Sequence, residues 1–172
     1  MNNFQFPISN FQKKRGFALL IAVIFMSVML TFGLALGSLA YKQQVLASSA
    51  VESQYAFYVA DAALECALYA DQQQNLFVFP TDGDPHAVPP MTCGGSAPIS
   101  TAELLYVPGT RWVVTERFSL DSGRRCADVT IYKPALGAGI TYLFSQGYDV
   151  SCATVASPAG ARFVSRGIKA HY

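Results

Sequence analysis

Residues 17–41 read FALLIAVIFMSVMLTFGLALGSLAY, and none of these 25 residues is Asp, Glu, Lys, Arg or His. At about 1.5 Å per residue, a helix of this length spans about 37 Å, which exceeds the thickness of a hydrocarbon core of about 30 Å. Backbone groups in that core must find their hydrogen-bond partners within the same segment. The sequence therefore predicts a membrane-spanning helix over residues 17–41.

Basic residues stand at one end of the apolar stretch. Lys13, Lys14 and Arg15 are consecutive, and only Gly16 separates them from the uncharged residues. Positive charge is retained on the cytoplasmic side of a membrane helix. We therefore expect a single pass through the cytoplasmic (inner) membrane, with the N-terminus inside and the C-terminal part of the chain outside.

The helical pattern continues beyond the apolar stretch, because residues 42–70 contain neither Gly nor Pro and are rich in helix formers. Apolar residues recur there at spacings of four, three and four, and they form one stripe along the helix: Val51, Tyr55, Tyr58 and Ala62. Asp71 is expected to face water or another subunit. We therefore expect one helix over residues 17–70, whose second half is amphipathic and must pack on a partner.

Residues 71–172 are expected to form an extracytoplasmic, β-rich head. Residues 72–100 hold most of the prolines and predict a long loop. Four later segments, separated by short turns, show strand-like alternation: residues 111–120, 126–132, 141–150 and 162–171. In the first of them, Glu116 interrupts an apolar face. The predicted fold class is α+β, with the long N-terminal helix packed on a four-stranded antiparallel sheet.

All four cysteines follow the apolar stretch, and their even number outside a membrane segment favours disulfides. We predict Cys66–Cys93, because Cys93 would pin the Pro-rich loop to the end of the helix. We also predict Cys126–Cys152, because the start of one strand lies beside the end of the next in an antiparallel hairpin. Pairing of Cys66 with Cys126 or Cys152 stays open as the alternative.

The residues Lys13-Lys14-Arg15-Gly16-Phe17, followed by an apolar helix, resemble the class III signal of type IV pilins and type II secretion pseudopilins. Residues 54–63 (QYAFYVADAA) are similar to the helix of minor pilins, in which an Ala-Phe pair precedes a small-acidic-small run. The resemblance covers about residues 13–70. It implies that residues 1–16 are a leader peptide, that prepilin peptidase cuts between Gly16 and Phe17, and that Phe17 becomes the N-methylated first residue.

The chain departs from the family at the fifth mature position. Pilins usually carry Glu there, whereas this sequence has Ile21. In the family that Glu is thought to pair with the N-terminal amine of a neighbouring subunit, which Ile cannot do. The resemblance therefore implies a minor subunit, assembled into or at the tip of a pilus or pseudopilus, with other pilin subunits as partners through the apolar helix.

Two other fates of the apolar helix compete with pilin-type processing. Small residues in Ser38-Leu39-Ala40 would suit an ordinary signal peptidase cutting after Ala40. Alternatively, the helix could stay uncleaved, as the single-pass anchor of an extracytoplasmic binding domain that joins no fibre. The N-terminal residue of the mature protein distinguishes these alternatives.

Signals for catalysis, metals and nucleic acid are weak. The sequence has no nucleophile elbow, P-loop or H-E-x-x-H motif, so we expect no enzyme and no cofactor. The acidic segment Asp82–His86 lacks the downstream ligands of a calcium loop, so we expect a solvated turn and no metal. Five basic residues could form a patch that binds DNA, namely Arg124, Arg125, Arg162, Arg166 and Lys169. The favoured interpretation is that they are solvent-facing strand residues.

Overall fold

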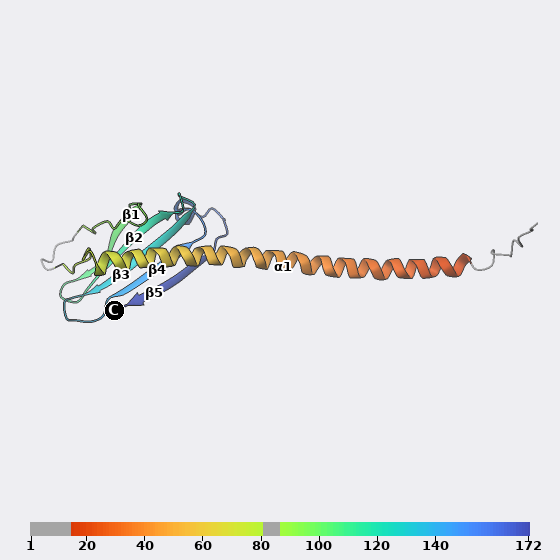
Figure 1. Cartoon of the computed structure of the whole chain (residues 1–172), viewed down its shortest axis with the longest axis horizontal. Helices are drawn as coiled ribbons and strands as arrows, with labels where there is room; N and C mark the ends of the chain where they lie inside the picture. The colour runs from red at the N-terminus through yellow and green to blue at the C-terminus, as the bar shows by residue number, and fades with distance from the viewer. Residues whose placement is uncertain (1–14, 81–86) are drawn as a thin grey trace, which may run out of the picture. The chain divides into compact units, whose positions relative to one another are not determined.

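The computed structural model describes residues 15–80 and 87–172 (Figure 1). Its elements are α1 (Arg15–Gln72), β1 (Ser100–Val107), β2 (Arg111–Leu120), β3 (Arg125–Pro134), β4 (Tyr142–Tyr148), α2 (Cys152–Ala156) and β5 (Ser165–His171). The chain divides into two compact units, Met1–Ala47 and Ser48–Tyr172, and α1 contributes to both. The predicted α+β fold with one long N-terminal helix is confirmed.

The first unit contains the apolar part of α1. Every residue from 17 to 47 is exposed in the structure, and the most apolar part of α1 has a mean hydropathy of 2.6. By length and composition, this helix can cross a membrane. The hydroxyls of Ser27, Thr31 and Ser38 donate to backbone carbonyls one turn earlier, at 2.7–2.9 Å. These three hydroxyls therefore find their partners within the helix, as an apolar environment demands.

The second unit is built on an antiparallel sheet in which each strand pairs with its neighbours in the chain, in the order β1-β2-β3-β4-β5. The sheet has five strands, so the prediction of four was wrong. The strand that was missed, β1, follows the loop at one edge of the sheet. Six of its eight residues are exposed, and its pairing with β2 is interrupted between Glu103 and Leu105. An exposed, irregular edge strand shows no hydrophobic alternation by which it could be recognised.

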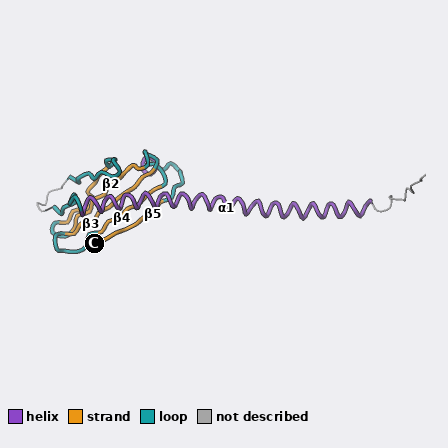
Figure 2. The backbone as a smooth tube through the Cα atoms, in the orientation of Figure 1, coloured by secondary structure: helices purple, strands orange, loops and turns teal. Residues whose placement is uncertain are grey.

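The second half of α1 lies over one face of the sheet, where its yellow-to-green part crosses the strands in Figure 1. The shared core contains Val59, Leu64 and Ala67 of α1 together with residues of three strands, namely Val114, Phe118, Val129, Ile131 and Leu143. Figure 2 shows the loops gathered at the ends of the strands. The helix therefore provides the cover that the sequence predicted for one face of the sheet.

The side of the helix that packs on the sheet differs from the predicted stripe. Val51, Tyr55 and Tyr58 are 46–65% exposed, so the prediction that they form the buried stripe was wrong. The face in contact with the sheet is rich in alanine, with Ala56, Ala60, Ala63, Ala67 and Ala70 at most 2% exposed. Small side chains allow the helix backbone to approach the sheet closely, which larger residues would prevent.

Helix and sheet approach each other closely at Gly147 on β4. A Cβ atom at this position would collide with the backbone of Ala56 and Ala60. Glycine is used where two backbones come this close, because any side chain would push them apart. Gly147 and the alanine-rich face of α1 thus form one complementary contact.

Strand β4 presents its aromatic residues to the face of the sheet that α1 does not cover. Leu143 and Ser145 are fully buried beneath the helix, whereas Tyr142 and Phe144 are 48% and 38% exposed. Tyr142 and Phe144 alternate with these residues along the strand predicted over residues 141–150, so they share one face. The register shows that this face is the outer one, because Tyr142 pairs with the half-exposed Tyr132 of β3.

Candidate functional site

The residues of the expected processing site lie at the start of α1. Gly16 and Phe17 are both within the helix, and the side chain of Phe17 is 71% exposed. Ile21 follows one turn later and is 48% exposed. The preceding residues Lys13 and Lys14 lie outside the described residues. An exposed aromatic residue at the helix start is open to contact by lipid or by another chain.

The apolar part of α1 carries a shallow groove where a glycine replaces a side chain. The groove is lined by Met26, Met29, Leu30, Gly33 and Leu34. Small residues allow helices to approach closely in apolar surroundings, where packing replaces the hydrophobic effect as the driving force. This surface is apolar and suits close packing against another helix.

One disulfide fastens the long loop to the end of α1. It joins Cys66 to Cys93, with Cα atoms 5.8 Å apart, and it is one of the two pairs that the sequence predicted. Cys93 and Ser96 form a small bridge of two backbone hydrogen bonds, each of 2.9 Å. Two residues before the cysteine, Met91 is 1% exposed and enters the core. The loop is therefore held both covalently and by burial.

A buried carboxylate provides a third attachment for this loop. Both carboxylate oxygens of Glu116, on the helix-facing side of β2, lie 3.2–3.4 Å from the backbone N–H of Met91, which donates to them. Glu116 is 1% exposed, and this burial raises its pKa to about 7, against a smaller lowering by the Met91 N–H. Glu116 interrupts the apolar face because it binds the loop.

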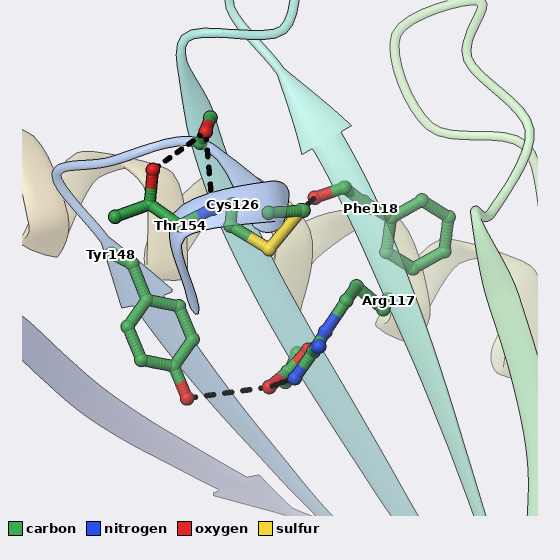
Figure 3. The surroundings of a disulfide bond; sticks show 8 residues. Arg117, Phe118, Cys126, Tyr148 and Thr154 are labelled. Carbon is green, nitrogen blue, oxygen red and sulfur yellow. Dashed lines mark hydrogen bonds and ion pairs between the residues drawn. A yellow bond between two sulfur atoms is a disulfide. The ribbon is translucent and has the colours of Figure 1, made fainter. Parts of the chain in front are cut away.

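The second disulfide joins Cys126 to Cys152, the other predicted pair, with Cα atoms 4.7 Å apart (Figure 3). Cys152 begins the short helix α2, whose first turn is capped by the Ser151 hydroxyl accepting from the Thr154 N–H. Cys126 is fully buried and lies at the start of β3. The bond therefore holds the segment between β4 and β5 against the sheet.

A polar network lies beside this disulfide on the outer face, as Figure 3 shows. Arg117 donates two hydrogen bonds to Asp128, at 2.6 Å and 2.8 Å, and these raise the pKa of its guanidinium. The Tyr148 hydroxyl donates to the same carboxylate at 3.3 Å. Burial, followed by the charge of Asp128, raises the pKa of Tyr148. These residues satisfy one another, which is typical of a structural network.

Asp71 was expected to face water or another subunit, and that prediction was wrong. Its side chain is fully buried and accepts two hydrogen bonds from Lys133 Nζ on β3. The hydroxyl of Tyr172 donates to the same carboxylate, and burial is the main cause of the raised pKa of Tyr172. A buried carboxylate requires such partners, because an unpaired charge is costly to bury. Asp71 therefore fastens the last turn of α1 to the sheet.

The five basic residues considered for DNA contact do not share one surface. Arg125 pairs with Asp121 and lies 4.0 Å from the centre of the Tyr55 ring, and Arg166 donates to Ser53 Oγ at 2.7 Å. Both therefore engage α1 on the helix-covered side. Lys169 pairs in register with Phe144 on the opposite face. The predicted acidic loop, Asp82–His86, lies outside the described residues.

Three features escaped the sequence analysis: the buried pair of Asp71 and Lys133, the contact between Glu116 and Met91, and a pocket on the outer face lined by the rings of Tyr132, Tyr142 and Phe144. The interruption of an apolar face by Glu116 was a usable signal for the second feature.

No protein-family model, curated protein or solved structure matches the chain.

Proposed function

We propose that this chain is a minor type IV pilin-like subunit. It is processed by prepilin peptidase, N-methylated at Phe17, and assembled into or at the tip of a pilus or pseudopilus. Before assembly it is a single-pass protein of the cytoplasmic membrane, with its N-terminus inside and its head outside. Other subunits contact it through the apolar part of α1, and after assembly it is part of an extracellular fibre.

The observation that carries the proposal is the direct junction between a basic, glycine-ended segment and an uninterrupted apolar helix. Residues 13–16 read KKRG, and residues 17–41 carry no charged side chain. Cleavage between Gly16 and Phe17 would remove the positive charges and leave the apolar helix whole. The groove around Gly33 would then be available to a neighbouring helix.

N-terminal sequencing of mature protein tests the processing step. We expect a methylated Phe17 as the first residue in cells that contain prepilin peptidase. Gly16→Leu should abolish cleavage, because a side chain replaces the glycine at the cut. The matched control is Ala40→Leu, which blocks ordinary signal peptidase but leaves cleavage at Gly16 intact. A mature N-terminus after Ala40 would overturn the proposal.

The minor role is supported by Ile21, which offers no carboxylate for the N-terminal amine of a neighbouring subunit. Such a subunit is suited to a position where no amine requires neutralisation, which favours the fibre tip. Quantitative mass spectrometry of sheared fibres should therefore find this chain at a small fraction of the major subunit. A chain more abundant than every other subunit would contradict the assignment.

The second candidate is a single-pass anchored domain that joins no fibre. The hydropathy and exposure of α1 suit this function equally well. An uncut N-terminus at Met1, together with absence of the chain from sheared fibres, would favour it. Both functions place the head outside the cytoplasmic membrane.

A further inference from the structure

A pocket of about 460 Å³ lies on the face of the sheet that α1 leaves uncovered. It spans four strands, β2 to β5, and the turns at their ends, and its principal lining residues are Arg111, Tyr132, Ile140, Tyr142, Phe144 and Lys169. The strand register brings these side chains together, since Tyr132 pairs with Tyr142 and Phe144 pairs with Lys169. The pocket belongs entirely to the head.

The aromatic rings of the pocket are exposed but held in place. Tyr132, Tyr142 and Phe144 are 37–48% exposed, so a large part of each side chain is accessible. The ring of Tyr142 lies against His171, with centroids 5.9 Å apart. The ring of Phe144 lies over Gly167, where an added Cβ would come within 2.9 Å of two ring atoms. Rings supported in this way form a pre-organised surface on which flat apolar groups can stack.

The charged residues of the pocket are both cations. No acidic residue lines it, and neither Arg111 nor Lys169 has a carboxylate partner among the described residues. Three other basic side chains of the head do pair with aspartates, as Arg117, Arg125 and Lys133 show. Uncompensated cations beside apolar rings favour a ligand that combines a flat apolar surface with a negative group.

The charge of the head limits how many negative groups that ligand carries. Residues 48–172 contain eight Lys or Arg and eleven Asp or Glu, a formal net charge of −3. A polyphosphate such as DNA would be repelled by this surplus, because its binding depends on neutralising many phosphates. A short ligand with a few carboxylates meets the two cations at a smaller electrostatic cost than a long polyphosphate does.

We propose that this pocket binds a carboxylated oligosaccharide. The C–H face of a sugar ring would stack on Tyr142 and Phe144, while its hydroxyls stay in water at the open side. The carboxylates would bond to Arg111 and Lys169, since charge-assisted hydrogen bonds to cations are the stronger kind. This site lies in the head, so it depends neither on leader cleavage nor on fibre assembly.

Calorimetric titration of the full chain in detergent micelles tests the site. The probes are tetrasaccharides of galacturonic acid, of hyaluronan and of alginate, with methyl-esterified tetragalacturonate as the neutral control and a thymidine hexanucleotide as the polyphosphate control. We expect at least one acidic tetrasaccharide to bind about tenfold more tightly than the ester, as loss of a charge-assisted bond implies. Absence of binding by all three, equal binding of the ester, or tighter binding of the oligonucleotide would overturn the proposal.

Two variants locate the binding. Tyr142→Ala and Lys169→Gln should each weaken binding of the acidic tetrasaccharide about tenfold or more. The matched controls are Tyr58→Ala, an exposed ring on α1, and Arg162→Gln, an exposed cation outside the pocket, which should leave affinity unchanged. Equal losses in variants and controls would refute the assignment. Urea unfolding of each variant distinguishes lost binding from lost folding, and N-terminal sequencing reports processing separately.

Discussion

The carboxylate of Asp71, in the last turn of α1, accepts hydrogen bonds from Lys133 Nζ at 2.6 Å and 2.7 Å. The two residues are 62 positions apart in the chain. The Asp71 side chain is fully buried, and that of Lys133 is 21% exposed. This pair ties the end of the helix to the third strand of the sheet.

Asp71→Asn should destabilise the head by about 3 kcal/mol, because it leaves Lys133 with a largely buried, unpaired charge. Urea unfolding followed by the fluorescence of Trp112, which is 2% exposed, measures this. The matched control is Asp121→Asn, which breaks the more exposed pair with Arg125 and should cost less than about 1 kcal/mol. Equal losses of unfolding free energy in the two variants would show that burial does not increase the contribution of the Asp71–Lys133 pair to stability.

The buried carboxylate of Glu116 predicts that the head loses stability as pH rises. Its pKa is about 7 in the folded protein, against an ordinary value of 4.5. The folded state therefore keeps a proton that the unfolded state releases between these values. Stability should fall through this window by up to about 3 kcal/mol, and the fall should be complete above the folded pKa.

Glu116→Gln provides the comparison, because it keeps an oxygen for the Met91 N–H and cannot ionise. The difference in unfolding free energy between the variant and the natural chain should grow in favour of the variant from pH 5 to pH 8. Taking this difference removes the contribution of the other titrating groups. A difference that does not change with pH would show that Glu116 titrates normally.

Gly147→Ala should destabilise the head by about 3 kcal/mol or prevent its folding, since its Cβ would meet helix backbone that cannot move aside. The matched control is Ser145→Ala, two residues away on the same buried face. Ser145 Oγ has no hydrogen-bond partner among the described residues, so its removal should cost less than about 1 kcal/mol. Tolerance of Gly147→Ala in urea unfolding would mean that α1 and β4 lie farther apart.

Peptide mapping without reduction should recover Cys66 joined to Cys93 and Cys126 joined to Cys152 in protein isolated from cells. Removing the first bond by the double change Cys66→Ala and Cys93→Ala should lower stability by about 3 kcal/mol, since it frees a closed loop of this length. Recovery of a peptide that joins Cys66 to Cys126 or Cys152, or of free thiols, would contradict this pairing.

Local patterns predicted the helix and four of the five strands, β2 to β5, with errors of at most three residues at their ends. The charge-free stretch from residue 17 and the absence of Gly and Pro after it were sufficient to predict α1. The alternation of Ala127, Val129 and Ile131 identified the buried face of β3, because a strand packed on one side shows it directly. In both cases the decisive residues are close together in the chain.

Features that depend on close approach or on distant partners were not predictable from one sequence. Large apolar residues such as Tyr55 dominate a hydrophobic stripe, whereas the contact is made by alanines that permit approach to Gly147. The partner of Asp71 lies across the fold, so a lone carboxylate at the end of a helix looked solvent-facing. The outer pocket can be recognised only once the register of the four strands β2 to β5 is known.

The order of the strands has a consequence for how the head forms while the chain is being made. Each strand pairs only with its neighbours in sequence, and the covering helix α1 precedes them all. Domains begin to fold from the N-terminal side during synthesis, and contacts between sequence neighbours form quickly. Because α1 and Cys93 both precede β1, the apolar cover and the first disulfide can be complete before any strand emerges. Each hairpin can then pack against α1 as it forms, which shortens the time during which the apolar face of the sheet is exposed to aggregation.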